Sequence, residues 1–301
     1  MGVIVRSSSL RKKLTLILLA AAACELGVGL AAEQRLTVPR ADGAQTPLLV
    51  YPAEGTGSGC APLAIISHGA GGSEEGYAYL AQAMAKLGYT TVAMGHRESG
   101  FAALAADVRE YGVLPGVTRL VADPRAEQAR LLDLDAALKW ADGQCRAPFR
   151  VLLGHSMGAE TVMLEAGAKN TIGVPSPPAA QNRFDAYVAL SPEGPGVVFA
   201  NDSWSGIRKP ALVLTGTRDE SLKGGPGARL TPWKNMRGLP SHCQWMGVID
   251  GATHLNFAGN GLGYESVEAI VTKTVGEFLD GVRAGSCALP AATSGMKLQA
   301  K

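Results

Sequence analysis

The sequence has no apolar segment long enough to cross a membrane as a helix. The apolar stretch Leu14 to Ala23 near the N-terminus covers ten residues, whereas a span needs about 20. Charge is also sparse, because charged residues make up 18% of the chain and the net charge is +2. Nucleic-acid-binding proteins carry clustered Lys and Arg, and no such run occurs beyond the first 13 residues. The composition therefore gives no indication of nucleic-acid partners or of a transmembrane span in the mature chain.

Residues 1–32 have the pattern of a secretory signal peptide. A basic region at 6–13 precedes the apolar stretch, and small residues offer a cleavage point near Ala31 or Ala32. Cys24 loosely resembles the lipid-bearing Cys of a bacterial lipoprotein signal, although Ala stands three positions before it where Leu is usual. We expect export to the periplasm or the extracellular space, with lipidation at Cys24 as the lesser alternative.

Beyond this signal, apolar runs of strand length alternate with segments of helical spacing. The runs are continuous, which is typical of strands that are buried on both faces of a parallel sheet. We predict strands at 35–39, 47–52, 62–69, 89–96, 149–156, 184–191, 210–216 and 243–250, and helices at 76–87, 124–141, 157–168 and 265–283. The first two strands are expected to pair antiparallel. The pattern predicts one α/β domain over 33–287, with its chemistry at the carboxyl ends of the strands.

Four cysteines remain in the mature chain, an even number that favours disulfides in an exported protein. Cys60 and Cys145 each lie just before strands that we expect to be neighbours. Cys243 begins the last strand, and Cys287 ends the helix that returns from it. We therefore predict the pairs Cys60–Cys145 and Cys243–Cys287. The small and polar residues 288–301 predict a disordered tail.

A Gly-x-Ser-x-Gly motif, GHSMG, lies where a predicted strand turns into a helix. Gly154 and Gly158 suit such a turn, because side chains at these positions would crowd the backbone around Ser156. The helix N-terminus that follows favours negative charge. A serine hydroxyl is a weak nucleophile, so catalysis also needs a base and an acid that orients it.

Both partners occur in the order Ser, acid, His. Asp219 follows the strand at 210–216, and His254 follows the strand at 243–250. We therefore predict Ser156 as nucleophile, His254 as base and Asp219 as the acid. Glu193 remains an alternative acid, because it too follows the carboxyl end of a strand.

An oxyanion hole is expected from the glycine-rich turn SHGAGGS at 67–73. The backbone N–H groups of Ala70 and Met157 are the predicted donors. The turn is not a dinucleotide loop, because Glu74 stands where the third glycine of Gly-x-Gly-x-x-Gly belongs. No Lys-Ser/Thr follows it, and no cluster of His, Cys or acidic residues has metal-ligand spacing. We therefore expect no cofactor and no metal.

The segments IISHGAGGSEEGYAYLAQAMAKLGYTTVAMGHRESG and GHSMGAETVMLEAGA resemble the α/β-hydrolase superfamily. Within it they are similar to predicted dienelactone hydrolases, a group that also resembles bacterial relatives of platelet-activating-factor acetylhydrolase and chlorophyllase. The resemblance implies a serine esterase whose triad is Ser156, Asp219 and His254. True dienelactone hydrolases use a Cys nucleophile, which is Ser here. Polyester-degrading cutinase-like enzymes share GHSMG but typically carry an aromatic residue after the next strand. The corresponding segment here, LSPEGPG at 190–196, has none, which disfavours polyester cleavage.

Specificity is less clear from the sequence. Four charged or polar side chains near predicted strand ends are candidates for the pocket: His96, Arg97, Glu98 and Glu193. A charged surface loop explains the first three equally well. The connections 100–123 and 194–208 are expected to border the site, the second with Phe199 and Trp204. Neither resembles a long apolar lid, which favours small soluble or short-acyl esters.

Three functional classes remain open. The first is a secreted serine esterase that cleaves carboxylic esters. The second is an acyltransferase or thioesterase with the same triad, which added alcohols or thiols would distinguish. The third is a non-catalytic hydrolase-like binding protein, which the position of all three triad residue types disfavours. In each case the expected partner is a small molecule, and the sequence leaves the oligomeric state open.

Overall fold

The computed structural model describes residues 1–2, 32–55, 57, 59–175, 182–290 and 294–301. The predicted signal peptide, including Cys24, lies almost entirely outside the described residues. Within the described ranges, no helix combines the length and apolar character needed to cross a bilayer.

One nine-stranded sheet forms the centre of the domain, in the order β1-β2-β4-β3-β5-β6-β7-β8-β9. Strands β3 to β8 pair in parallel, whereas β1 pairs antiparallel with β2, β2 with β4, and β8 with β9. This confirms the predicted α/β class and the antiparallel pair at the start. The strands are β1 (Gln34–Pro39), β2 (Gln45–Tyr51), β3 (Leu63–Ser67), β4 (Thr90–Met94), β5 (Arg150–His155), β6 (Ala186–Leu190), β7 (Ala211–Arg218), β8 (Gln244–Thr253) and β9 (Met296–Ala300).

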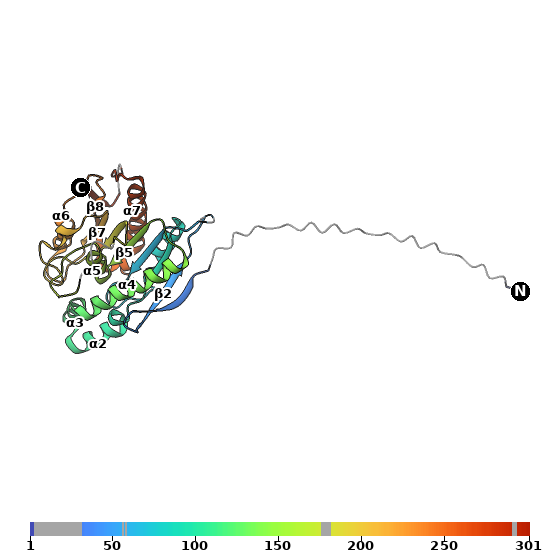
Figure 1. Ribbon diagram of the computed structural model, residues 1–301, viewed down its shortest axis with the longest axis horizontal. Coiled ribbons are helices and arrows are strands. Elements are labelled where there is room, and N and C mark those ends of the chain that lie inside the picture. Colours follow the sequence, from blue (N-terminus) through green and yellow to red (C-terminus); the bar gives the residue numbers. More distant parts are fainter. Residues whose placement is uncertain (3–31, 56, 58, 176–181, 291–293) are drawn as a thin grey trace. The chain divides into compact units, whose positions relative to one another are not determined.

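Helices cover both faces of this sheet, as the continuous apolar runs predicted. Figure 1 shows the long helix α4 on one side of the strands and α7 on the other. One apolar core lies between the sheet and α4 and α5, and a second lies between the sheet and α1 and α7. The helices are α1 (Ala78–Lys86), α2 (Phe101–Tyr111), α3 (Val113–Val121), α4 (Pro124–Gln144), α5 (Met157–Glu165), α6 (Thr231–Asn235) and α7 (Tyr264–Ala284).

Helices α2 and α3 occupy the long connection between β4 and α4. None of the residues of α2 is fully buried, yet Leu104 touches the loop that follows β3. A Cβ atom added to Gly71 of that loop would lie 2.4 Å from Leu104 Cδ2. Helix α2 therefore rests on the glycine-rich turn, and the predicted position of 100–123 beside the site agrees with this contact.

The prediction of a disordered tail over 288–301 is wrong for its end. Residues Met296–Ala300 form β9, which pairs with β8 from Trp245↔Ala300 to Ile249↔Met296. The sequence MKLQA alternates apolar and polar residues, and this alternation suits an edge strand with one covered face. The pairing also satisfies the backbone groups along the free side of β8.

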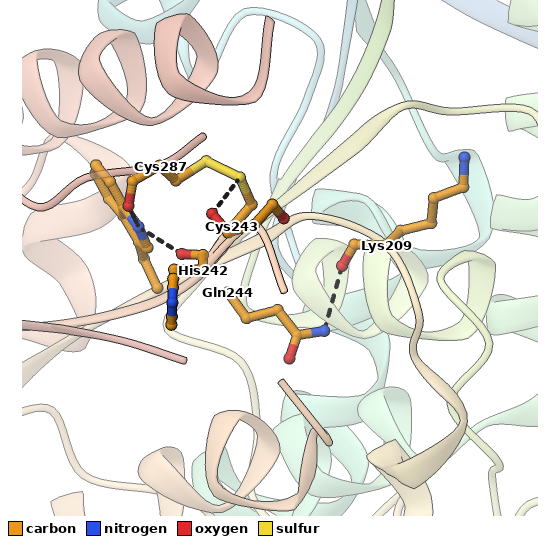
Figure 2. Close-up of a disulfide and its surroundings, with 7 residues drawn as sticks. Lys209, His242, Cys243, Gln244 and Cys287 are labelled. Atoms are coloured by element: carbon orange, nitrogen blue, oxygen red, sulfur yellow. Dashed lines mark hydrogen bonds between the residues drawn. A yellow bond between two sulfur atoms is a disulfide. The ribbon is translucent and has the colours of Figure 1, made fainter. Parts of the chain in front are cut away.

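The four cysteines form the two predicted bonds. Cys60–Cys145 joins the segment before β3 to the end of α4, and Cys243–Cys287 joins the start of β8 to the chain after α7. Figure 2 shows the second bond beside Gln244, whose side-chain amide donates to Lys209 O at 3.3 Å. Both bonds lie where strands β3, β5 and β8 begin, which is the edge opposite to the strand ends that carry the candidate site.

Candidate active site

Ser156 lies at a sharp turn between β5 and α5, and its backbone has a positive φ of 54°. Two glycines make the turn possible. A Cβ atom added to Gly154 would lie 2.2 Å from Gly158 O, and one added to Gly158 would lie 2.0 Å from Ser67 O. Both distances are far shorter than any real carbon–oxygen contact, so only glycine fits. The strained turn holds the Ser156 hydroxyl at the N-terminus of α5.

The structure brings Ser156, His254 and Asp219 together from three strand ends. His254 Nε2 lies 2.9 Å from Ser156 Oγ, and His254 Nδ1 lies 3.1 Å from Asp219 Oδ1. With the proton on Nδ1, the ring donates to the carboxylate and its Nε2 is free to accept the serine proton. His254 begins the short 3₁₀ helix η5 (His254–Ala258), directly after β8.

Asp219 is completely buried and is held in its ionised form. Burial alone would raise its pKa, but the hydrogen bond from His254 and the charge of Arg229 lower it below the usual value. Arg229 Nε lies 2.8 Å from Asp219 Oδ1, and Thr215 donates to Oδ2 at 2.7 Å. A carboxylate with these partners can stabilise a positively charged imidazole.

Ser191 is a member of the site that the sequence analysis missed. It follows β6, is fully buried, and has a positive φ of 50°. Its Oγ lies 2.7 Å from His254 Nδ1 and also hydrogen-bonds Asp219. Its position directly after a buried strand was the available signal, but a serine there does not stand out in the sequence beside the carboxylate of Glu193.

Arg229, also unforeseen, joins the loops around Asp219. It donates to Ser191 O at 2.9 Å and to Pro192 O at 3.1 Å, in addition to its contact with Asp219. Nothing in the sequence near Arg229 marks it, because it belongs to the 3₁₀ helix η4 (Pro226–Leu230) between β7 and α6.

The two predicted oxyanion donors flank the nucleophile. Ala70 lines the same cavity as Ser156, and Met157 is the first residue of α5. Among the described residues, neither N–H donates to another backbone carbonyl, whereas the neighbouring Gly71 and Gly72 N–H groups both do. The free N–H groups can therefore donate hydrogen bonds to an external oxyanion.

His155 and Tyr77 connect the two sides of the cavity. Tyr77 Oη lies 2.6 Å from His155 Nδ1, and His155 Nε2 lies 3.1 Å from His254 O. Burial lowers the pKa of His155 well below its usual value, so the ring is neutral, with one donor and one acceptor. Gly69 N donates to Tyr77 Oη at 3.3 Å. This chain links the glycine-rich loop to the residue that carries the base.

The cavity over Ser156 has a volume of about 290 Å³. Its walls come from the glycine-rich loop, from His155 and from the segment after His254, including Leu255, Ala258 and Asn260. Leu255 is 58% exposed although it is a large apolar residue. A small cavity with an apolar rim suits a compact ester rather than a long extended chain.

None of the four predicted pocket residues lines this cavity. His96 is buried beneath it and hydrogen-bonds Asp133, while Arg97 points to solvent. Glu98 pairs with Arg40 at 2.6 Å, away from Ser156. Glu193 is buried, and it accepts hydrogen bonds from Leu222 N and from Ser221. Its carboxylate lies 3.5 Å from Arg229 Nη1. Glu193 therefore stabilises the loop after β7 that carries Asp219, and Asp219 is the carboxylate that contacts His254.

The segment 194–208 also differs from its predicted role. Phe199 and Trp204 are fully buried in the core beside α5, with their rings 5.1 Å apart. They belong to the same apolar core as residues of α5 and do not border the cavity. In the described parts of the chain, no three His, Cys, Asp or Glu side chains are arranged to hold a metal ion.

Several solved structures share this fold at low sequence identity. A predicted dienelactone hydrolase from Klebsiella pneumoniae is 18% identical over 84% of this chain and 98% of its own, with a TM-score of 0.61. The protein Est1E from Butyrivibrio proteoclasticus is 17% identical over 83% and 99%, with a TM-score of 0.55. A lidless α/β serine hydrolase from Xanthomonas campestris is 19% identical over 86% and 98%, with a TM-score of 0.52.

The sequence itself matches no protein-family profile and no curated protein. The structural likeness therefore rests on topology, and it shows that the chain has the α/β-hydrolase fold. This confirms the fold that the resemblance of GHSMG and the glycine-rich turn implied.

Proposed function

We propose that the protein is an exported serine hydrolase that cleaves carboxylic esters through Ser156, His254 and Asp219. The observation that carries the proposal is the continuous chain from Ser156 Oγ through His254 to Asp219, with contacts of 2.9 and 3.1 Å. Hydrolase structures with the same fold are consistent with it.

In the proposed reaction, His254 Nε2 takes the hydroxyl proton as Ser156 Oγ attacks the ester carbonyl carbon. The oxyanion that forms accepts hydrogen bonds from Ala70 N–H and Met157 N–H. His254 then returns the proton to the leaving alcohol, and an acyl-enzyme remains on Ser156. A water molecule loses a proton to His254 and attacks the acyl carbon, which releases the acid and restores the serine hydroxyl. Asp219 orients the imidazole and balances its charge in both halves.

The substrate is proposed to be a small or short-acyl ester. The 290 Å³ cavity and the exposed Leu255 support this size and an apolar acyl group. The two disulfides are consistent with export, because such bonds persist in oxidising compartments. The proposed reaction needs no cofactor or metal.

The test is the hydrolysis of p-nitrophenyl esters from acetate to palmitate by the mature protein and by Ser156→Ala. We expect hydrolysis to be fastest with short chains and to fall to the uncatalysed rate in Ser156→Ala. Ser286→Ala is the matched control, because Ser286 is exposed after α7 and contributes nothing to the cavity. Equal rates in the wild type and Ser156→Ala would contradict the proposal and favour a binding role. Faster acyl release with added alcohol or thiol would indicate an acyltransferase or thioesterase.

A further inference from the structure

A single buried arginine lies beneath the glycine-rich loop. Arg130 of α4 is fully buried, although arginine is almost never fully buried without partners. Its Nη1 donates to His68 O at 2.7 Å and to Ser67 Oγ at 3.2 Å, and its Nε donates to Ser99 Oγ at 2.8 Å. The guanidinium thus binds two segments of chain at once.

These two segments hold Ala70 from both sides. Ser67 and His68 lead into the loop from β3, and Ser99 O accepts a hydrogen bond from Gly71 N at 2.8 Å. Gly71 N belongs to the peptide that follows Ala70, and His68 O belongs to the peptide one residue before the Gly69–Ala70 peptide that carries the Ala70 N–H. Arg130 therefore contacts a residue on each side of the turn, His68 and Ser99. The direction of the Ala70 N–H therefore depends on where the guanidinium holds His68 and Ser99.

A second chain of contacts from α4 reaches the same loop. Asp133, one turn after Arg130, hydrogen-bonds His96 Nδ1 at 2.8 Å, and His96 Nε2 lies 2.9 Å from Ser67 Oγ. His96 N also donates to His68 Nε2 at 3.0 Å. Ser67, His96 and Asp133 have the residue types of a catalytic triad, but all three are buried. Ser67 Oγ also accepts a hydrogen bond from Arg130 Nη1. Their arrangement is structural, and it explains why His96 is absent from the cavity wall.

Carboxyl groups from α4 and from the nucleophile helix surround Arg130. Glu127 of α4 and Glu160 of α5 are both completely buried and interact with the guanidinium, as does Asp133. Glu160 N donates to Ser156 O at 3.1 Å in the first turn of α5. The arginine therefore lies between the helix that carries the nucleophile and the loop that carries the oxyanion donor.

We propose that Arg130 is a positioning residue that fixes the Ala70 N–H in the direction needed to bind the oxyanion. This inference rests on the proposed function, since it assumes that an oxyanion forms at Ser156. Arg130 itself touches no substrate, because it does not line the cavity.

The experiment compares Arg130→Lys, Arg130→Met and Ser99→Ala with the wild type. The lysine keeps a charge but cannot bind His68 O and Ser99 Oγ together as the planar fork does. Ser99→Ala removes only the side-chain acceptor and is the milder change. Arg183→Met is the matched control, because Arg183 is a largely buried arginine that pairs with Glu165 and Asp135 away from the loop. Thermal unfolding establishes that each variant is folded.

Three quantities are measured: kcat and KM for p-nitrophenyl butyrate, the inhibition constant of a trifluoromethyl ketone, and amide exchange of residues 68–72. The ketone adds to a catalytic serine and places an oxyanion in the hole, so its affinity reports on the loop. We expect Arg130→Met to lower kcat roughly 10- to 100-fold with little change in KM, and to weaken ketone binding by a similar factor. Arg130→Lys should lose less kcat and less ketone affinity than Arg130→Met, and Ser99→Ala should lose the least. The amide of Gly71 should exchange faster in all three variants.

Unchanged kcat in a folded Arg130→Met would overturn the inference. So would a loss of kcat without weaker ketone binding, or one matched by Arg183→Met, because either would indicate a general structural effect. If Arg130→Met does not fold, Arg130→Lys and Ser99→Ala decide by the same criteria. A wild type without esterase activity would contradict the proposed function, and amide exchange of 68–72 would then decide the role of Arg130 in the loop by itself.

Discussion

Ser191 Oγ lies 2.7 Å from His254 Nδ1, closer than the 3.1 Å that separates this nitrogen from Asp219 Oδ1. The nitrogen carries one proton, so the serine and the carboxylate share a single donor. The Ser191 hydroxyl can in turn donate to Asp219, which makes the orienting group of His254 a pair of residues. Both come from loops at the carboxyl ends of neighbouring strands, β6 and β7.

Ser191→Ala should therefore reduce kcat by about 10-fold, the effect of losing one hydrogen bond to a charged group. Asp219→Asn should reduce it far more, by about 10⁴-fold, because it favours the wrong imidazole tautomer. The measurement is kcat for a short p-nitrophenyl ester in both single variants and in the double variant. If Ser191 acts through Asp219, the two losses will not add in free energy. Fully additive losses would show that the two residues act independently.

Arg229→Met should destabilise the fold at neutral pH by about 3 kcal/mol, because it leaves the buried Asp219 carboxylate without its cation. The pKa of Asp219 is lowered in the folded protein, so its contribution to stability is present above the ordinary carboxyl range. That contribution is lost as the pH falls through the lowered pKa.

The difference in the free energy of unfolding between wild type and Arg229→Met should therefore narrow below about pH 4. Urea unfolding at pH 7, 5 and 3.5 measures it. A difference that is constant across this range would mean that Arg229 stabilises the loops only through its bonds to Ser191 O and Pro192 O.

Glu127 and Glu160 should make the protein less stable as the pH rises. Burial raises the pKa of Glu127 to about 7, and burial together with the neighbouring Glu127 raises that of Glu160 well above its usual value. Both carboxyl groups therefore stay protonated to a higher pH in the folded chain than in the unfolded chain. Stability is therefore fully present below the unfolded pKa near 4.3 and is lost as the pH rises through the folded values.

Glu160→Gln removes one of the two neighbouring buried carboxyl groups. The free energy of unfolding of this variant should therefore fall less between pH 5 and 8 than that of the wild type. The expected difference is on the order of 1–3 kcal/mol. Parallel stability curves for the two proteins would show that the carboxyl pair does not titrate in this range.

The disulfides should support the fold and leave the reaction unchanged. They close segments of 85 and 44 residues, so replacing either pair by serine should lower the free energy of unfolding by about 2–4 kcal/mol. Both pairs lie at the opposite edge of the sheet from Ser156, so kcat/KM at 25 °C should stay within about twofold. Peptide mapping without reduction checks the connectivity, and a Cys60–Cys243 peptide would contradict it.

The sequence predicted strands β1 to β8, helices α1, α4, α5 and α7, and the places of Ser156, Asp219 and His254 after strands, because each depends on a local pattern. A buried strand is a continuous apolar run, and a residue just after it must lie at the carboxyl edge. The direction of a side chain was not predictable in this way. His96 and Glu193 both follow strands, yet they turn inward to Asp133 and to the loop at Leu222.

Arg130 escaped prediction for a related reason. It occupies the middle of a helix with ordinary polar spacing, and its partners are 31 to 63 residues away in sequence. The strand β9 was missed because five residues of mixed polarity carry little signal until β8 provides a partner. Contacts between distant segments decide these features, and a single sequence does not reveal them.

The most direct test of the account is covalent labelling by a fluorophosphonate, followed by mass spectrometry of the digested protein. We predict one phosphonate adduct per chain on the peptide that contains Ser156, no adduct in Ser156→Ala, and much slower labelling in His254→Ala. Labelling of a different serine, or none in the folded wild type, would contradict the assignment of Ser156 as a nucleophile activated by His254.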